Sequence, residues 1–432
     1  MSLLVPNALS LKDKASYLRT LPAIRERCGR VFELAKAGKL EYFDYHADKE
    51  EEVTDFCLNI IQRDFGTDYS QIPPHGRWRH FDFGRKRVEG LVSEWDGSKE
   101  SSKRLVDLFV ISVLLDAGAG KDWTFHEEST GESYSRSEGL AICSMHMFQI
   151  GLFSSLPDQP HRVDAIGLSK ITTEIIAQHM QVSESNPIIG LQGRTSLLQN
   201  LSHALSSNPD FFGKDGRPGN MLDFLEKESK LQGTTRLVPL SALWHVLIDG
   251  LNPIWPESRI KLAGVSLGDV WPCNALASTS SSSEEGDNLV PFHKLTQWLT
   301  YSLVEAITYS MKWKFVGTED MTGLPEYRNG GLLLDIGVIT LKPNVLPIDT
   351  KSGLPKASPS DPAIVEWRAL TVILLDRIAN SIRTKLNLTP DQLTLAQVLE
   401  SATWKGGREI AKQKRPATGG PPLELDSDGT VF

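Results

Sequence analysis

The stretch DPAIVEWRALTVILLDRIANSI, residues 361–382, decides the fold class. Asp361 is a preferred N-cap residue and Pro362 suits the first helical position, so we expect a helix to begin here. One helical face follows a period of about 3.6 residues. This face comprises Ile364, Trp367, Thr371, Leu374, Ile378 and Ile382, and it is widened by Leu370, Ile373 and Leu375. A stripe this wide predicts a central helix that is buried on more than one side.

Other segments repeat this helical signal. Thr20 and Pro22 predict the start of a helix that runs to about Lys36, and a further apolar helix is expected over residues 292–311. The best strand candidate is Leu332–Leu341, LLLDIGVITL, because it is rich in branched apolar residues and ends before a Lys-Pro pair. The sequence therefore predicts a mainly α fold with a small β element.

The chain has 432 residues, a length that allows two or three domains of about 100–200 residues each. We expect one elaborated helical domain over residues 1–404, because helical segments lie on both sides of every candidate boundary. Residues 277–287, ASTSSSSEEGD, are Ser-rich and acidic and predict a flexible loop. Residues 405–432 mix Lys, Gly and Pro and predict a mobile tail.

Composition narrows the class of protein. The formal net charge of -8 disfavours a protein that binds the nucleic-acid backbone. The four cysteines form no C-x-x-C pair, which suits a reducing compartment and gives no zinc-ribbon spacing. The longest apolar stretch, Leu105–Leu115, is too short to span a bilayer, and the first residues lack the pattern of a signal peptide. We expect a soluble cytoplasmic protein without nucleic-acid or membrane partners.

Two catalytic fingerprints are incomplete. LDAGAGKD at residues 115–122 lacks the first Gly and the final Ser or Thr of a phosphate-binding loop. Gly264–Gly268 has the form G-x-S-x-G, but only His293 follows Ser266, which leaves little room for a hydrolase triad. The ten His residues are scattered, and none lies in a set with metal-ligand spacing, so no metal site is predicted.

Two basic segments could hold a small anion. PHGRWRHFDFGRKR at residues 74–87 places Arg77 and Arg79 among aromatic residues, and guanidinium groups suit phosphate oxygens. Arg136 lies at the expected start of a helix, where backbone N–H groups could also bind an anion. The alternatives remain open: a solvated basic loop in the first case and an ordinary capped helix in the second.

Three carboxylates lie beside aromatic residues in the second half of the chain. Asp269 occurs in GVSLGDVW, Glu326 in LPEYRNGG and Glu366 in VEWRAL. Hydrolysis of a glycosidic bond needs carboxylates that stabilise an oxocarbenium-like transition state or activate water. Apolar residues around such carboxylates adjust their pKa. The alternative is that Glu366 and Arg368 form structural ion pairs.

Nearly the whole chain resembles the uracil catabolism protein 4 family, long described as a domain of unknown function. The motifs that carry the resemblance are HGRWRHF, LLDAGAGKDW, RSEGLA, NPIIGLQGR, RPGNMLDFL, LGDVW and TGLPEYRNGG. The resemblance implies a part in a pathway that converts uracil to urea by way of a ribotide.

The C-terminal half is also similar to the queuosine salvage proteins, which are helical N-glycosylases related in fold to DNA glycosylases. Their Ala-Asp-x-Trp, Ala-Asp-Tyr-Arg and Glu-x-Arg motifs match residues 268–271, 325–328 and 366–368 in order. Glu326 stands where those proteins have Asp, which moves the carboxylate by one methylene. This similarity implies a helical DNA-glycosylase-like domain.

Together these resemblances imply hydrolysis of the N-glycosidic bond of a ring-opened, ureido-type pyrimidine ribotide, without a metal or organic cofactor. Asp269 and Glu326 are the expected catalytic residues. The expected substrate-binding residues are Trp271, Tyr327, Arg328, Glu366, Arg368, Arg77, Arg79 and Arg136. The alternatives are an amidohydrolase acting on the ureido group and a non-catalytic ribotide-binding or scaffold protein that associates with pathway enzymes.

Overall fold

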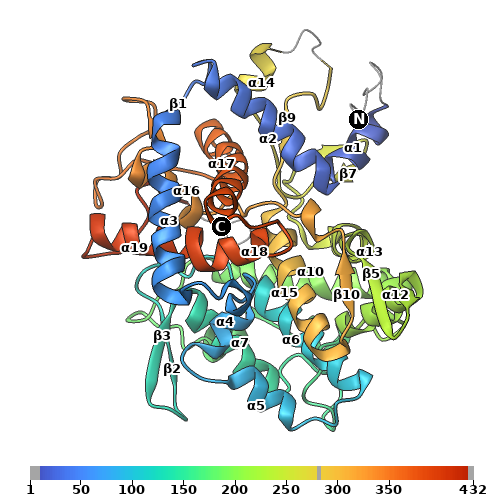
Figure 1. Ribbon diagram of the computed structural model, residues 1–432. Helices are drawn as coiled ribbons and strands as arrows, with labels where there is room; N and C mark the ends of the chain where they lie inside the picture. Colours follow the sequence, from blue (N-terminus) through green and yellow to red (C-terminus); the bar gives the residue numbers. More distant parts are fainter. Residues whose placement is uncertain (1–9, 280–283, 427–432) are drawn as a thin grey trace. The chain divides into compact units, whose positions relative to one another are not determined.

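The computed structural model describes residues 10–279 and 284–426, and it confirms the mainly α class (Figure 1). The chain divides into two compact units. Unit 1 comprises the described residues of Met1–Pro74, Glu257–Lys294 and Glu319–Asp426, and unit 2 comprises His75–Pro256 and Leu295–Thr318.

Unit 1 is built around α17 (Pro362–Leu386), the helix predicted from residues 361–382. Its predicted cap is present, because Asp361 accepts a hydrogen bond from the backbone N–H of Ala363 at 2.9 Å. Helices α2 (Leu21–Lys36) and α3 (Glu50–Phe65) pack against α17, and all three are visible in Figure 1. The predicted helix after Thr20 is thereby confirmed, with Thr20 as its N-cap.

The remaining helices of unit 1 are α1 (Leu11–Leu18), α14 (Asn274–Thr279), α16 (Tyr327–Ile336), α18 (Leu395–Val398) and α19 (Trp404–Lys414). Its strands are short and form separate two-stranded pairs. They are β1 (Phe43–Tyr45) with β11 (Ile339–Leu341), β6 (Lys261–Leu262) with β7 (Val265–Ser266), β8 (Val270–Pro272) with β9 (Leu289–Pro291), and β12 (Lys356–Ala357) with β13 (Glu424–Leu425).

The strand predicted over Leu332–Leu341 is wrong in its first half. Residues through Ile336 belong to α16, and Gly337 ends that helix in the left-handed region at φ 88°. Only Ile339–Leu341 forms a strand. The helix prevails because Glu326 caps its start and Gly337 ends it, so the branched apolar residues between them pack as a helical face.

Two segments predicted to be irregular carry structure where they are described. Helix α19 begins at Trp404 and packs against α16, within the stretch for which the sequence predicts a tail. In the Ser-rich segment, residues 280–283 lie outside the described residues. The acidic residues that follow bind Lys14, whose Nζ lies 2.7 Å from Glu284 and 2.9 Å from Asp287.

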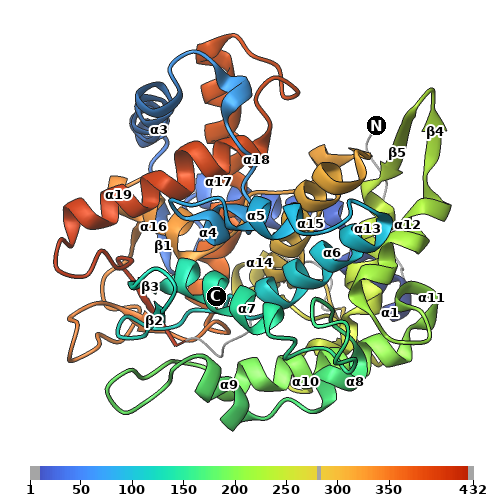
Figure 2. The same ribbon diagram turned by 90° about the horizontal axis from the view of Figure 1, so that it is seen from below.

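Unit 2 is also helical, and α8, α9 and α10 lie side by side in it (Figure 2). Its helices are α4 (Trp78–Asp82), α5 (Arg87–Ser93), α6 (Lys99–Leu114), α7 (Arg136–Gln149), α8 (Ala165–Ser169), α9 (Thr173–His179), α10 (Leu191–Ser207), α11 (Pro209–Phe212), α12 (Met221–Glu228) and α13 (Leu240–His245). Helix α15 (Lys294–Met311) starts at the last residue of unit 1 and continues in unit 2.

The strands of unit 2 form one hairpin and one three-stranded sheet. The hairpin pairs β2 (Thr124–Glu127) with β3 (Glu132–Ser135), and the sheet has the order β10 (Lys314–Val316), β5 (Thr235–Pro239), β4 (Lys230–Gln232). Across the part of the chain that the structure describes, no helix combines the length and apolar character needed to cross a bilayer.

Candidate functional site

Asp269, just before β8, accepts four hydrogen bonds from described residues of unit 1. Its Oδ1 accepts hydrogen bonds from Arg368 Nη1 and Trp271 Nε1, each at 2.7 Å. Its Oδ2 accepts from Arg368 Nη2 at 2.7 Å and from the backbone N–H of Lys294 at 2.9 Å. Burial alone would raise the pKa of Asp269, but the charge and hydrogen bonds of Arg368 hold that pKa below its ordinary value. Asp269 is therefore a fixed negative charge.

The backbone of residues 292–294 is folded around Asp269. The Asp269 carbonyl oxygen accepts hydrogen bonds from the N–H groups of Phe292 at 2.9 Å and His293 at 3.3 Å. His293 adopts a left-handed φ of 49°, which is uncommon for a residue other than Gly, and the next N–H, from Lys294, reaches the carboxylate. Burial lowers the pKa of His293 to about 4, so its ring is neutral near pH 7. No motif in the sequence indicates this role of His293.

Glu326 has the opposite electrostatic character. It caps α16, and its carboxylate oxygens accept hydrogen bonds from the N–H groups of Arg328 and Asn329, each at 2.7 Å. Burial raises the pKa of Glu326 above its ordinary value, although these bonds and the charges of Lys294 and Arg328 act against the rise. The carboxyl of Glu326 is thus the better proton donor of the two.

Arg368 connects the two carboxylate segments. Besides its two bonds to Asp269, its Nε donates to the carbonyl oxygen of Pro325, the residue before Glu326, at 3.3 Å. Its guanidinium also lies 4.1 Å from the centre of the Phe292 ring. Arg368 is almost fully buried, so it positions Asp269 and the start of α16 from inside unit 1.

Arginine guanidinium groups lie over two of the aromatic rings predicted for the site. Arg259 lies 4.8 Å from the centre of the Trp271 ring, and Arg328 lies 5.0 Å from that of Tyr327. Tyr327 is half-buried, whereas Trp271 is buried and anchored on Asp269. Sequence reasoning did not find Arg259, because no motif spacing links it to Trp271.

Glu366 has a different set of partners. Its carboxylate accepts hydrogen bonds from the N–H groups of Glu41 at 3.1 Å and Tyr42 at 3.0 Å, and burial raises its pKa. Glu366 thereby holds the segment between α2 and β1 against α17. Arg368, two residues later, forms an ion pair with Asp269, whereas Glu366 accepts from backbone N–H groups.

The three arginines predicted to bind phosphate belong to unit 2. Arg77 is fully buried: its Nε donates to Ser112 Oγ at 2.8 Å, and its Nη1 pairs with Asp116 at 2.6 Å. Arg79 pairs with Glu305. Arg136 is half-buried at the start of α7, with a left-handed φ of 55°. In unit 1, Arg368 links Asp269 and Trp271 to the backbone of Pro325, next to Glu326, Tyr327 and Arg328, whereas these three arginines lie in the other unit.

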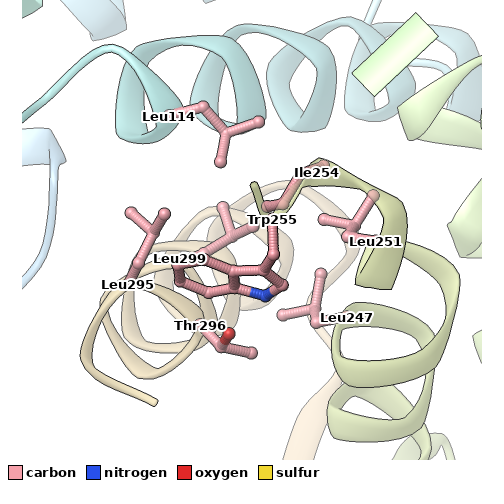
Figure 3. Close-up of a pocket in the computed structure, with 8 residues that line it drawn as sticks. All are labelled: Leu114, Leu247, Leu251, Ile254, Trp255, Leu295, Thr296 and Leu299. Atoms are coloured by element: carbon pink, nitrogen blue, oxygen red, sulfur yellow. The ribbon is translucent and has the colours of Figure 1, made fainter. Parts of the chain in front are cut away.

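Unit 2 contains a small apolar pocket (Figure 3). Trp255 stands among its lining residues, which are Leu114, Leu247, Leu251, Ile254, Leu295, Thr296 and Leu299. Its interior of about 10 Å³ has room for about one water molecule. This pocket is too small to hold a nucleotide.

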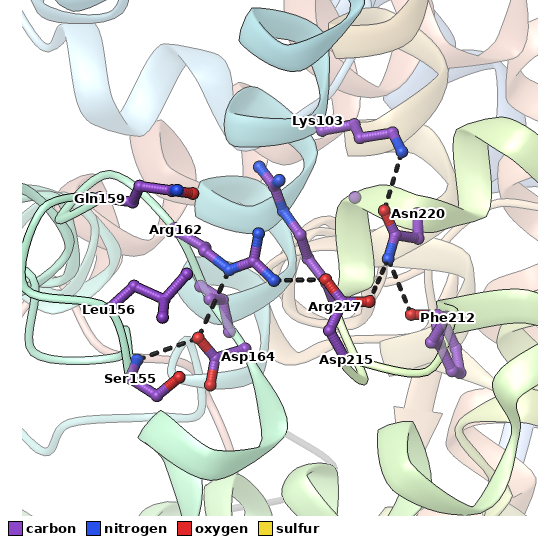
Figure 4. Close-up of polar contacts among 12 residues, drawn as sticks. Lys103, Ser155, Leu156, Gln159, Arg162, Asp164, Phe212, Asp215, Arg217 and Asn220 are labelled. Carbon is purple, nitrogen blue, oxygen red and sulfur yellow. Dashed lines mark hydrogen bonds and ion pairs between the residues drawn. The ribbon is translucent and has the colours of Figure 1, made fainter.

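A polar network surrounds the RPGN segment of unit 2 (Figure 4). Arg162 pairs with Asp164 and Asp215, and Asn220 donates to Asp215 at 2.8 Å. Arg217 donates from Nε to the buried carboxylate of Asp107 at 2.7 Å. The network ties together loops that follow α7 and α11, so this motif has a structural explanation. Among the described residues, no group of three or more His, Cys, Asp or Glu side chains could hold a metal ion.

Comparisons with known proteins cover nearly the entire chain. The family model described as "Protein of unknown function (DUF1688)" matches residues 17–432. The chain is 42% identical to "Uracil catabolism protein 4" of Lachancea kluyveri over 98% of this chain and 100% of that protein. It is also 42% identical to "Protein urg3" of Schizosaccharomyces pombe, over 97% of this chain and 99% of that protein. The chain therefore belongs to the DUF1688 family and, with its full-length relatives, to the uracil catabolism protein 4 family.

Proposed function

We propose that this protein acts in uracil catabolism as a hydrolase that cleaves the N-glycosidic bond of a pyrimidine ribotide. The substrate is a ring-opened, ureido-type derivative, and the products are ribose 5-phosphate and a urea. The name of the Lachancea kluyveri relative supports the pathway. The reaction rests on one observation: unit 1 holds two carboxylates on adjoining segments and pushes their pKa values in opposite directions.

Such a pair divides acid and electrostatic roles between its members. Glu326, which keeps its proton to higher pH, donates that proton to the glycosidic nitrogen as the bond from nitrogen to C1′ breaks. Asp269, which stays ionised, supplies the negative charge that stabilises the positive charge developing on the ribose. Water then adds its hydroxyl to C1′ and returns a proton to Glu326.

The supporting residues suit this division. Asp269 accepts four hydrogen bonds, and its pKa lies below the ordinary value. It therefore acts through its negative charge and not as a proton acceptor. Trp271 and Tyr327 would form the walls of the sugar site, and Arg368 would keep Asp269 and Glu326 in register. Arg77, Arg79 and Arg136 remain predictions for phosphate binding, each with the partner or position in unit 2 given above.

The test is a substrate panel. The purified, chelator-treated protein is incubated with pyrimidine ribotides and their ureido forms, and release of ribose 5-phosphate is followed by mass spectrometry. Release from a ureido ribotide, lost in Glu326→Gln, would support the proposal. Release of ammonia or carbon dioxide with the glycosidic bond intact would support the amidohydrolase. Tight binding without turnover would support the non-catalytic ribotide-binding protein.

A further inference from the structure

We infer that Arg328, in unit 1, binds the phosphate monoester of the ribotide. This inference rests on the proposed function, because it assigns the anionic part of the same substrate. It places phosphate recognition two residues from the proposed acid, Glu326, and not on the basic segment around Arg77.

Arg328 is one of the buried arginines that form no ion pair with a carboxylate among the described residues, and it is the one that lies two residues from Glu326. Arg328 is only 5% exposed. Among the described residues, its guanidinium makes one hydrogen bond, from Nη1 to the carbonyl oxygen of Gly419 at 2.7 Å. Among the described residues, no carboxylate forms an ion pair with it. Arg77, Arg217 and Arg368 are also buried, and each pairs with an aspartate. Arg27 and Arg194 are buried and donate to carbonyl oxygens, but neither lies beside a proposed catalytic carboxyl.

The charge of Arg328 acts on the carboxyl of Glu326, which is neutral when it holds the proton that the proposed reaction needs. In that state a bound anion would balance the buried cation. The guanidinium is a planar fork of N–H donors that matches two phosphate oxygens, and Arg328 uses only one donor on a neutral carbonyl. The Tyr327 ring, 5.0 Å from the guanidinium, limits the orientations of that fork. Arg328 therefore has donors and charge to offer a dianionic phosphate.

The location links this charge to the proposed chemistry. The backbone N–H of Arg328 donates to Glu326 at 2.7 Å, so the acid and the cation belong to one turn of α16. A phosphate at Arg328 would thus hold the ribose beside Glu326. Arg77 already uses Nε and Nη1 on Ser112 and Asp116 inside unit 2, and Arg79 pairs with Glu305.

Arg328 also contacts the C-terminal strap, which we define as residues 415–425. Arg415 makes a parallel contact: its Nε donates to the Gly420 carbonyl at 2.8 Å, but its charge is neutralised by Asp335. The two arginines therefore make similar bonds to the strap and differ in their need for an anion. This difference provides a matched control.

The experiment measures binding of ribose 5-phosphate and of ribose to the full chain by titration calorimetry. Arg328→Gln should weaken binding of ribose 5-phosphate by about 30-fold, as expected for a charge-assisted pair, and leave binding of ribose unaffected. Arg328→Lys should recover part of the loss. The control, Asp335→Asn with Arg415→Gln, removes the other strap contact without leaving a buried charge and should bind ribose 5-phosphate as wild type does.

Three results would overturn the inference. They are equal binding by wild type and a folded Arg328→Gln, an equal loss in the Asp335→Asn/Arg415→Gln control, and loss in Arg79→Gln with normal binding in Arg328→Gln. The hydrolysis assay separates this inference from the proposed function. Arg328-dependent binding without hydrolysis would refute only the glycosidase, whereas hydrolysis with an unchanged KM in Arg328→Gln would refute only the phosphate assignment.

Discussion

Arg368 and Asp269 form a two-pronged ion pair in which both nitrogen–oxygen distances are 2.7 Å and each side chain is only 1% exposed. The two residues are separated by almost one hundred positions in the sequence, and they join the residue before β8 to the N-terminal part of α17. Because a lone buried charge is far more costly than a buried pair, each residue depends on the other.

Removing one member of this pair should destabilise unit 1 severely. We expect Arg368→Gln to lower the free energy of unfolding by about 3–5 kcal/mol, the cost typical of leaving a buried charge unpaired. Arg368→Lys should recover little, because Lys cannot form the two-pronged contact. Urea denaturation measures the loss. The double variant Asp269→Asn/Arg368→Gln should lose less than the two single variants combined, and strict additivity would show that the pair is not coupled.

The pH dependence of activity should report the raised pKa of Glu326. As the proposed acid, Glu326 must be protonated, so kcat/KM should fall as pH rises through a pKa above the ordinary value. Asp269, whose pKa is lowered, stays ionised over this pH range, so it causes no further change in kcat/KM there. Glu326→Gln should lower kcat/KM by about 100-fold or more and abolish its decrease with rising pH. Activity that instead increases across this interval would contradict the assignment of Glu326 as the acid.

A glycine pair tests the packing between α16 and α17. A Cβ at Gly330 would lie 2.6 Å from Cε2 of the buried Trp367 ring, so Gly330→Ala should destabilise the protein by about 1–3 kcal/mol. Gly29, in α2, has open space at its Cβ position, and Gly29→Ala should stabilise by about 0.5–1 kcal/mol. Thermal unfolding of the two variants measures both effects. A neutral Gly330→Ala would show that Trp367 can move.

Local signals predicted the helices well, and they failed where two signals compete. Caps at Thr20 and Asp361 and the period of the apolar residues identified α2 and α17. The segment after Glu326 reads as a strand by composition, but its cap and Gly337 make it a helix. Branched apolar residues suit both structures, so the termini decide.

Sequence motifs grouped the site residues but could not give their partners. Motif order associated Asp269 and Glu326, and unit 1 links their segments through Arg368. The partners of Glu366 are backbone N–H groups more than three hundred residues earlier, and no spacing rule indicates such a contact. A charged residue in a motif looks the same whether it binds substrate or a distant part of its own chain.

The most direct test of the glycosidase is the fate of the water oxygen. The reaction is run with a ureido ribotide in water enriched in oxygen-18, and the products are reduced immediately with borohydride to prevent exchange at C1′. A parallel sample of unlabelled ribose 5-phosphate corrects for residual exchange. The account predicts one labelled oxygen on C1′ of the ribose product and none in the urea. Label in the carbonyl fragment, with the ribose still attached to nitrogen, would contradict it.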